Sequence, residues 1–121
     1  MYSNKKIGYL GEKIAKKFLT SKGFHILKEN FFTPFGEIDL ITKKNNMIIF
    51  IEVKTKQEPI FLCPLLSITK TKQNHILKNC LYTIKFYKLY NYSWRIDAIG
   101  ITLDNKLKTK TIKHVKNICK I

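Results

Sequence analysis

The chain is poor in cysteine and lacks the cysteine spacing of a metal site. Its three cysteines, Cys63, Cys80 and Cys119, are far apart and odd in number, and they include no CxxC pair. This pattern argues against a structural zinc site and against a framework of disulfide bonds. We therefore expect no disulfide bond, and cysteines that stay reduced and serve in packing.

Long apolar runs are also missing. No segment approaches the roughly 20 consecutive apolar residues that a membrane-spanning helix needs. Near the N-terminus, lysines interrupt the apolar residues, which is not the pattern of a secretory signal. The 121 residues, 45% of them hydrophobic, suit one domain with one core. We expect a cytoplasmic protein that spans no membrane and forms a single domain over residues 1–121.

Acidic residues are few, and this imbalance points to an anionic partner. The chain has 8 Asp and Glu residues against 23 Lys and Arg residues, a formal net charge of +15. Such a charge favours nucleic acid as a partner. However, Arg95 is the only arginine, and lysine binds phosphate without the planar fork of arginine. The abundance of Lys, Ile and Asn is also what an AT-rich coding sequence produces, so the charge alone does not establish nucleic-acid binding.

Hydrophobic periodicity predicts two helices and five strands. Helices are expected at 7–19 and 68–89, where apolar residues recur at three- and four-residue spacing. The predicted strands are 24–27, 37–42, 47–55, 93–104 and 108–115. Residues 30–36, which include a proline and a glycine, are expected to form an irregular loop. The order helix, strand, strand, strand, helix, strand, strand predicts an α/β fold with a central mixed sheet flanked by helices.

The segments EIDLIT and MIIFIEVKT bring acidic and basic residues to one face of a predicted hairpin. If the two asparagines between these segments form a two-residue turn, Asp39 lies directly opposite Glu52, and Glu37 lies directly opposite Lys54. A four-residue loop would instead leave Asp39 and Glu52 diagonal to each other. Either turn keeps the acids and the lysine on the same face.

Two adjacent carboxylates repel each other and require compensation. A nearby lysine provides it, and so does a hard divalent cation such as Mg²⁺, which takes oxygen ligands. A bound ion of this kind activates water and polarises a phosphoryl oxygen, and a lysine beside it can orient the water or stabilise charge on phosphorus. The alternative is a solvated salt-bridge lattice on an exposed face. Ile41, Ile48 and Phe50 share the face of the charges, which argues against that alternative.

Several short motifs follow one another along nearly the whole chain. They are GYLGEKIAKKFLTSKGF, EN, GEIDLI, IIFIEVKTK, SITKTKQ, RIDAIGI and HVKN. The succession resembles the YraN-like family of predicted endonucleases, an uncharacterised group similar to archaeal Holliday junction resolvases among the PD-(D/E)xK nucleases. The most specific part is GEIDLI followed at this spacing by EVK. The resemblance implies a restriction-endonuclease-like core.

The resemblance also implies roles for three residues of the predicted hairpin. Asp39 and Glu52 match the acids that bind Mg²⁺ or Mn²⁺, and Lys54 matches the catalytic lysine. These roles agree with the chemistry expected from the residues themselves, because the same three side chains share one face of the hairpin.

Four more residues are carried over from the family pattern. Glu12, in the motif GEKIA, matches an acidic residue that resolvase-like members add to the catalytic site. Glu37 matches a characteristic family residue, which we group with the catalytic residues as a partner of Lys54. Lys72 and Gln73 match a helix position that faces the site in related nucleases, and we assign them an accessory role.

Together these features predict a metal-dependent endonuclease that hydrolyses phosphodiester bonds of DNA, including branched or structured DNA. The alternative is a non-catalytic nucleic-acid-binding module that retains the nuclease fold. Docking onto a protein or membrane partner is the least favoured function, because the lysines are not segregated on one face. Resolvase-like relatives act as dimers, so the resemblance leaves a homodimer open.

Overall fold

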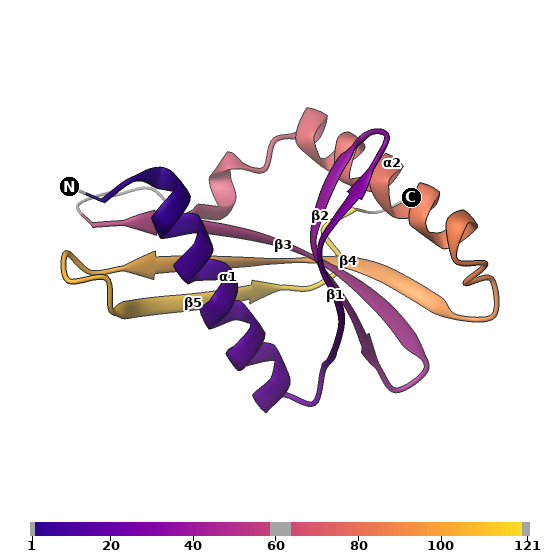
Figure 1. Ribbon diagram of the computed structural model, residues 1–121, viewed down its shortest axis with the longest axis horizontal. Helices are drawn as coiled ribbons and strands as arrows, with labels where there is room; N and C mark the ends of the chain where they lie inside the picture. Colours follow the sequence, from indigo (N-terminus) through magenta and orange to yellow (C-terminus); the bar gives the residue numbers. More distant parts are fainter. Residues whose placement is uncertain (1, 59–63, 120–121) are drawn as a thin grey trace.

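Two α-helices, a short 3-10 helix and five strands make up the described part of the chain (Figure 1). The structure is a computed structural model that describes residues 2–58 and 64–119. The elements are α1 (Asn4–Ser21), β1 (His25–Thr33), β2 (Gly36–Lys44), β3 (Met47–Gln57), η1 (Pro64–Ser67), α2 (Lys70–Phe86), β4 (Ser93–Leu103) and β5 (Thr109–Val115). This order confirms the predicted succession of helices and strands.

The five strands form one mixed sheet in the order β1-β2-β3-β4-β5. Only β3 and β4 run parallel, with pairing from Met47–Ser93 to Gln57–Leu103, and the other neighbours are antiparallel. Two parallel strands need a long crossover connection, and α2 lies on the crossover between β3 and β4. The predicted α/β fold with a central mixed sheet flanked by helices is therefore confirmed.

Each face of the sheet is covered by one helix, and the alternation along β3 explains why. Ile49, Ile51 and Val53 pack in the core on the α1 side, whereas Ile48 and Phe50 pack with α2 on the other side. Successive side chains of a strand point to opposite faces. Glu52 and Lys54 continue the set that faces α2, so the charged end of this strand lies on the α2 side.

Side-chain caps determine where the two long helices begin. The Ser3 hydroxyl accepts a hydrogen bond from the backbone N–H of Lys6, so α1 begins before the first apolar residue of its stripe. Thr69 caps α2 in the same way through the N–H of Lys72. A hydroxyl at this position satisfies one of the free N–H groups of the first helical turn.

The predicted loop at residues 30–36 is wrong, because this segment belongs to a β-hairpin. β1 continues to Thr33 and β2 begins at Gly36, so the turn is limited to the two residues between them. Phe31 packs against the rings of Phe86, the last residue of α2, and Tyr87, the residue after it, with centroids 6.3 and 5.5 Å away. This aromatic contact anchors a hairpin that the proline and glycine had marked as irregular.

The predicted two-residue turn between β2 and β3 is confirmed. Lys44 pairs with Met47, and Asn45 has the left-handed φ of 56° that such a turn favours. Pairing then continues in the predicted register, but it ends at Leu40 and Ile51.

Beyond Leu40 and Ile51, the β1–β2 hairpin leaves β3, and we call this divergence the fork. Figure 1 shows the hairpin standing away from the long β3–β4 ribbon and reaching α2. The predicted direct pairs of Asp39 with Glu52 and of Glu37 with Lys54 are therefore wrong, because both lie past the last paired residues. Glu37 instead pairs with Phe32 of β1. A hairpin that packs on α2 cannot also stay in line with β3.

Two further features complete the description of the fold. Cys80 and Cys119 carry free thiols, and Cys63 lies outside the described residues. Among the helices of residues 2–58 and 64–119, none combines the length and apolar character needed to cross a membrane.

Candidate functional site

Asp39 lies on β2 at the fork, next to the last paired residue. Its Oδ2 accepts a hydrogen bond of 2.8 Å from the backbone N–H of Val53 on β3. Burial, and then the negative charge of Glu52, raise the pKa of Asp39 to about 7. The two carboxylates therefore act on each other at short range, even though their residues are not paired in the sheet.

Glu52 and Lys54 occupy alternate positions on β3 and so share the face toward α2. Lys54 Nζ lies 3.4 Å from Glu52 Oε1, and the Glu52 side chain is only 14% exposed. Burial raises the pKa of Glu52, and the positive charge of Lys54 opposes this rise. The lysine thus partly compensates a carboxylate that the sheet holds away from solvent.

A cavity of roughly 230 Å³ opens between β3 and the beginning of α2. Its polar lining residues are Glu37, Glu52 and Lys54 from the strands, together with Lys72 and His75 from α2. Its remaining lining residues are the apolar side chains of Ile68 and Ile76. The cavity therefore has two acids and a lysine on the sheet side and a second lysine on the helix side, so charges of both signs line one space.

Asn30 connects two acids that come from different elements. Its Nδ2 donates to Glu12 Oε1 of α1 at 2.8 Å and to Glu37 Oε1 of β2 at 2.6 Å. Burial raises the pKa of Glu12, the Asn30 hydrogen bond lowers it, and the charges of Asp39 and Glu37 raise it further. Glu12 therefore belongs electrostatically to the acids of the fork, although it lies on the opposite helix.

Close packing of α1 on β3 brings Glu12 to the fork. A Cβ atom at Gly11 would overlap the side chain of Thr55, so only glycine allows the helix to approach the strand this closely at that point. Glu12 is the next residue along the helix. In the GEKIA motif, Gly11 thus allows the close contact with β3, and this contact positions the carboxylate of Glu12.

Half of the acidic residues of a strongly basic chain meet at the fork. They are Glu12, Glu37, Asp39 and Glu52, out of 8 in total. The other acids have partners elsewhere: Glu29 with Lys16, Glu58 with Lys110, Asp97 with Arg95 and His114, and Asp104 with the backbone N–H groups of Lys106 and Lys108. Within residues 2–58 and 64–119, the pair of Lys54 and Glu52 is the only ion pair at the fork. The four acids at the fork therefore carry more negative charge than the nearby ion-paired lysine compensates.

The donor set at the fork fits a hard divalent cation. No group of three or more His, Cys, Asp or Glu side chains among the described residues is arranged to hold a metal ion. Mg²⁺, however, is usually bound by one or two carboxylates and completes its shell with water and substrate phosphate. Asp39 and Glu52 offer two such carboxylates with oxygen donors only.

The structure separates the two predicted accessory residues. Lys72 lines the cavity of Glu52 and Lys54, whereas Gln73 lines a different cavity of roughly 160 Å³ near β4 and the C-terminal segment. Successive helical residues are about 100° apart around the axis, so they do not share a wall. His75, three residues after Lys72, does share it, and this i, i+3 spacing was the available signal.

Sequence reasoning assigned no role to Asn30. The residue lies in the EN motif, at the start of the predicted loop 30–36, and its left-handed φ of 47° is unusual for the strand in which it lies. Asparagine tolerates this conformation better than most residues. Its position in the motif was visible, but its contacts to Glu12 and Glu37 depend on two elements that periodicity does not bring together.

The fold and the fork define a class of protein: an α/β domain whose mixed sheet carries an acidic site where two strands diverge. The sequence profile of Uncharacterised protein family UPF0102 matches residues 11–101. A UPF0102 protein of Thermodesulfovibrio yellowstonii is 43% identical over 111 residues, covering 92% of this chain and 93% of the relative. A UPF0102 protein of Clostridium botulinum strain Kyoto is 40% identical over 121 residues, covering 99% and 98%.

The chain therefore belongs to the uncharacterised family UPF0102. This membership confirms the family resemblance drawn from the motifs.

Proposed function

We propose that this protein is a metal-dependent endonuclease that hydrolyses phosphodiester bonds of DNA. One observation carries the proposal: Glu52 and Lys54 line a cavity together with Lys72, and Glu52 interacts at short range with the half-buried carboxylate of Asp39. Uncompensated acids favour a cation, and the adjacent lysines favour a phosphate. A phosphodiester bound at a divalent ion is the substrate that uses both.

Asp39 and Glu52 are the residues that would hold Mg²⁺ or Mn²⁺. The bound ion would supply Lewis acidity toward a phosphoryl oxygen and toward a water molecule. In its absence, burial and mutual repulsion favour a proton on Asp39, as its pKa of about 7 reflects. The hydrogen bond from the Val53 N–H holds the Asp39 carboxylate in place in either state.

Lys54 has the central role in the proposed reaction. The oxygen of a water molecule bonds to phosphorus, the bond between phosphorus and one ester oxygen breaks, and the departing oxygen takes a proton from solvent. The Lys54 ammonium group orients the attacking water and stabilises the negative charge that develops on the phosphoryl oxygens. Glu37, on the wall of the same cavity, accepts the proton that the water loses.

Glu12 and Lys72 complete the proposed site from the two helices. Glu12 adds negative charge behind Asp39, which strengthens the preference of the fork for a cation. Lys72 lies on the opposite wall of the cavity and is suited to bind the phosphate on the strand being cut. Gln73 has no part in this proposal, because its side chain lines another cavity.

The second candidate is a nucleic-acid-binding module without turnover. The observation that favours it is the net charge of +15, which attracts nucleic acid whether or not the acids bind a metal ion. In that case the acids at the fork would serve only to position the β1–β2 hairpin and α1.

Cleavage assays with matched variants separate the two functions. Linear duplex, single-stranded and branched DNA are incubated with Mg²⁺ or Mn²⁺ and with the wild type, Asp39→Ala or Lys54→Met. We expect cleavage by the wild type and a loss of at least about 100-fold in either variant. Asp104→Asn, which changes an exposed acid in the β4–β5 turn, is the control and should cleave normally.

Two outcomes of this assay contradict the nuclease. Equal cleavage by the wild type and Asp39→Ala would show that the activity does not depend on the proposed site. DNA binding by both proteins with cleavage by neither would identify the binding module instead.

A further inference from the structure

A cavity of roughly 360 Å³ lies far from the acids of the fork. It is formed by the β2–β3 turn, the first residues of β3 and β4, and the segment after β5. The residues that line it are Lys44, Asn45, Asn46, Met47, Ile49, Ser93, Arg95 and Lys116. Three are cations, three are neutral hydrogen-bonding residues and none is acidic, so the cavity has the composition of an anion site.

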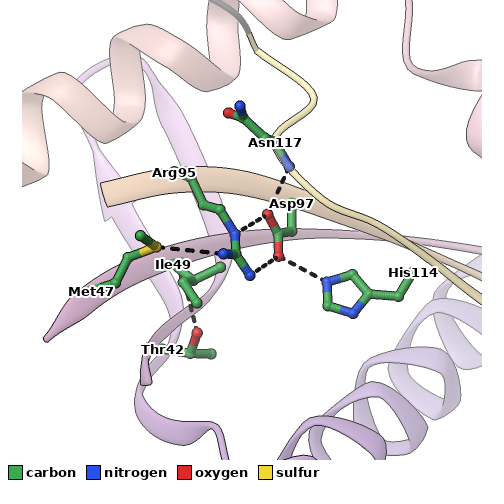
Figure 2. A network of polar contacts seen from close by, with 7 residues as sticks. All are labelled: Thr42, Met47, Ile49, Arg95, Asp97, His114 and Asn117. Carbon is green, nitrogen blue, oxygen red and sulfur yellow. Dashed lines mark hydrogen bonds and ion pairs between the residues drawn. The ribbon is translucent and has the colours of Figure 1, made fainter. Parts of the chain in front are cut away.

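Arg95 is held rigidly in the wall of this cavity. Its Nε donates to Asp97 Oδ1 at 2.9 Å and its Nη2 donates to Asp97 Oδ2 at 3.2 Å (Figure 2). Asp97 is fully buried and also receives the N–H of Asn117 and a contact from His114. These partners hold the Asp97 carboxylate in place, and the carboxylate in turn orients the Arg95 guanidinium group.

One side of the Arg95 guanidinium keeps unused hydrogen-bonding capacity. Among the described residues, Nη1 donates only to the sulfur of Met47, at 3.5 Å, and a thioether is a weak acceptor. An oxyanion in the cavity would be a stronger acceptor for this group. Because Asp97 already holds the Arg95 guanidinium group in place, binding of an anion would cost little side-chain entropy. Asp97 cancels the charge of Arg95, so Arg95 supplies geometry while the net attraction comes from the lysines.

The two lysines of the cavity supply the positive charge. The Lys44 ammonium group lies 4.9 Å from the centre of the Phe24 ring, which restrains it beside the turn. Lys116 is exposed and follows β5 directly. Arg95 is the only arginine among the 23 Lys and Arg residues of the chain, so this wall carries the one guanidinium group of the protein.

We propose that this cavity is a second phosphate-binding site, which takes a backbone phosphate of a nucleic acid at a distance from the acids of the fork. Lys54 lies seven positions after Met47 on β3, or about 23 Å along the extended strand. The cavity also opens on the α1 side, as Ile49 and Arg95 do, whereas Glu52 and Lys54 face α2. The site is therefore an anchoring point and not part of the fork.

Nuclear magnetic resonance in the presence of EDTA tests the site without any cleavage. Inorganic phosphate, and separately a short DNA duplex, are titrated into the full chain in a buffer whose only other oxyanion is the EDTA, kept at the same concentration throughout. We expect both to shift the signals of the Arg95 Nε–H and of the Asn45, Asn46 and Ser93 amides. Shifts with phosphate but none with DNA would mean that the cavity binds a free anion only, and would overturn the proposal.

Two variants with the same change of charge make the test specific. Lys116→Glu alters the cavity, and Lys106→Glu alters an exposed lysine at the far end of β4, in the β4–β5 turn. We expect Lys116→Glu to weaken DNA binding about fivefold more than Lys106→Glu and to lower the salt dependence by about one phosphate contact. Equal weakening by the two variants would overturn the proposal. A further variant of the cavity, Lys44→Gln, should also weaken DNA binding, as Lys116→Glu does.

This test does not depend on the proposed nuclease. The measurements use neither a divalent metal ion nor turnover, and they leave Asp39, Glu52 and Lys54 unchanged. Failure of the cleavage assay therefore leaves the phosphate site standing, and failure of the titration leaves the nuclease standing.

Discussion

Asp39 Oδ2 accepts the backbone N–H of Val53 at 2.8 Å, just beyond the last paired residues of β2 and β3. The carboxylate thus bonds to the backbone of β3 where the partner strand has turned away. This bond ties the charged end of β2 to β3 at the fork. The same side chain is therefore both a structural acceptor and one of the acids that we expect to hold a cation.

Replacing this carboxylate should stabilise the metal-free protein. Asp39 has a pKa of about 7 in the folded state against an ordinary value of 3.8. Between these values the folded state binds more protons than the unfolded state, so stability falls as the pH rises from about 4 to about 7 and stays lower above it. Asp39→Asn removes this loss and keeps an oxygen for the Val53 N–H. In EDTA at pH 8 we expect a higher Tm, by roughly 4 °C for each kcal/mol gained.

With a bound metal ion, the wild type should become more stable than Asp39→Asn. Mg²⁺ should raise the Tm of the wild type at pH 8, because a ligand that binds only the folded state stabilises it. It should raise the Tm of Asp39→Asn much less. A wild-type Tm that does not respond to Mg²⁺ or Mn²⁺ would argue against a cation site at the fork.

Asn30 should control the protonation of Glu12. Its hydrogen bond lowers the pKa of Glu12 against the effect of burial, so loss of the amide should raise that pKa. Asn30→Gly is the suitable variant, because glycine adopts the left-handed φ of 47° without strain. Asn30→Ala removes the same amide but adds about 1 kcal/mol of backbone strain.

Carboxyl ¹³C titrations would measure this effect directly. Both variants of Asn30 should show the same rise in the pKa of Glu12, and only the alanine variant should lose the additional stability. An unchanged Glu12 pKa in Asn30→Gly would mean that the amide does not couple the two acids.

The sequence was sufficient to predict the elements of the sheet and the turn between β2 and β3. Strict alternation along β3 separates Ile49 and Ile51 from Ile48 and Phe50, and the structure packs them on opposite faces. The two asparagines fix the register because they favour the left-handed conformation of a tight turn. Features of this kind can be predicted because they depend on residues within one strand or on two strands joined by a short turn.

The fork could not be predicted from such patterns. The predicted register assumes that β2 and β3 stay paired along their whole length. Here the packing of Phe31 on the end of α2 draws the β1–β2 hairpin away from β3. The contact joins residues more than fifty positions apart in the chain. For the same reason, the bridge from Asn30 to Glu12 and the separation of Lys72 from Gln73 depend on tertiary packing, which no local period encodes.

Two glycines of α1 should respond in opposite ways to the same substitution. A Cβ at Gly11 would overlap Thr55, so Gly11→Ala should cost about 1–3 kcal/mol of unfolding free energy. Gly8 has no atom within 4 Å of the added Cβ, so Gly8→Ala should stabilise the helix by about 0.5–1 kcal/mol. Urea denaturation measures both. If Gly11→Ala is neutral, α1 does not depend on this close approach to β3.

Burial of Asp97 should make the protein sensitive to acid. Burial alone would raise the pKa of this carboxyl, but hydrogen bonds from His114, Arg95 and Asn117 outweigh it and hold the pKa below its ordinary value (Figure 2). A lowered folded-state pKa contributes stability that is present above the unfolded value of about 4 and is lost as the pH falls through the folded value. The wild type should therefore lose stability below about pH 4, with a steeper slope than Asp97→Asn.

The partner of this carboxylate decides how costly its loss is. At neutral pH, Asp97→Asn should cost about 3 kcal/mol, because it leaves the half-buried guanidinium of Arg95 without a counter-charge. The double variant Asp97→Asn/Arg95→Met removes the stranded cation and should be more stable than Asp97→Asn alone. Chemical denaturation at pH 7 compares the two. A double variant that is less stable than Asp97→Asn would mean that Arg95 stabilises the fold through contacts other than its ion pair with Asp97.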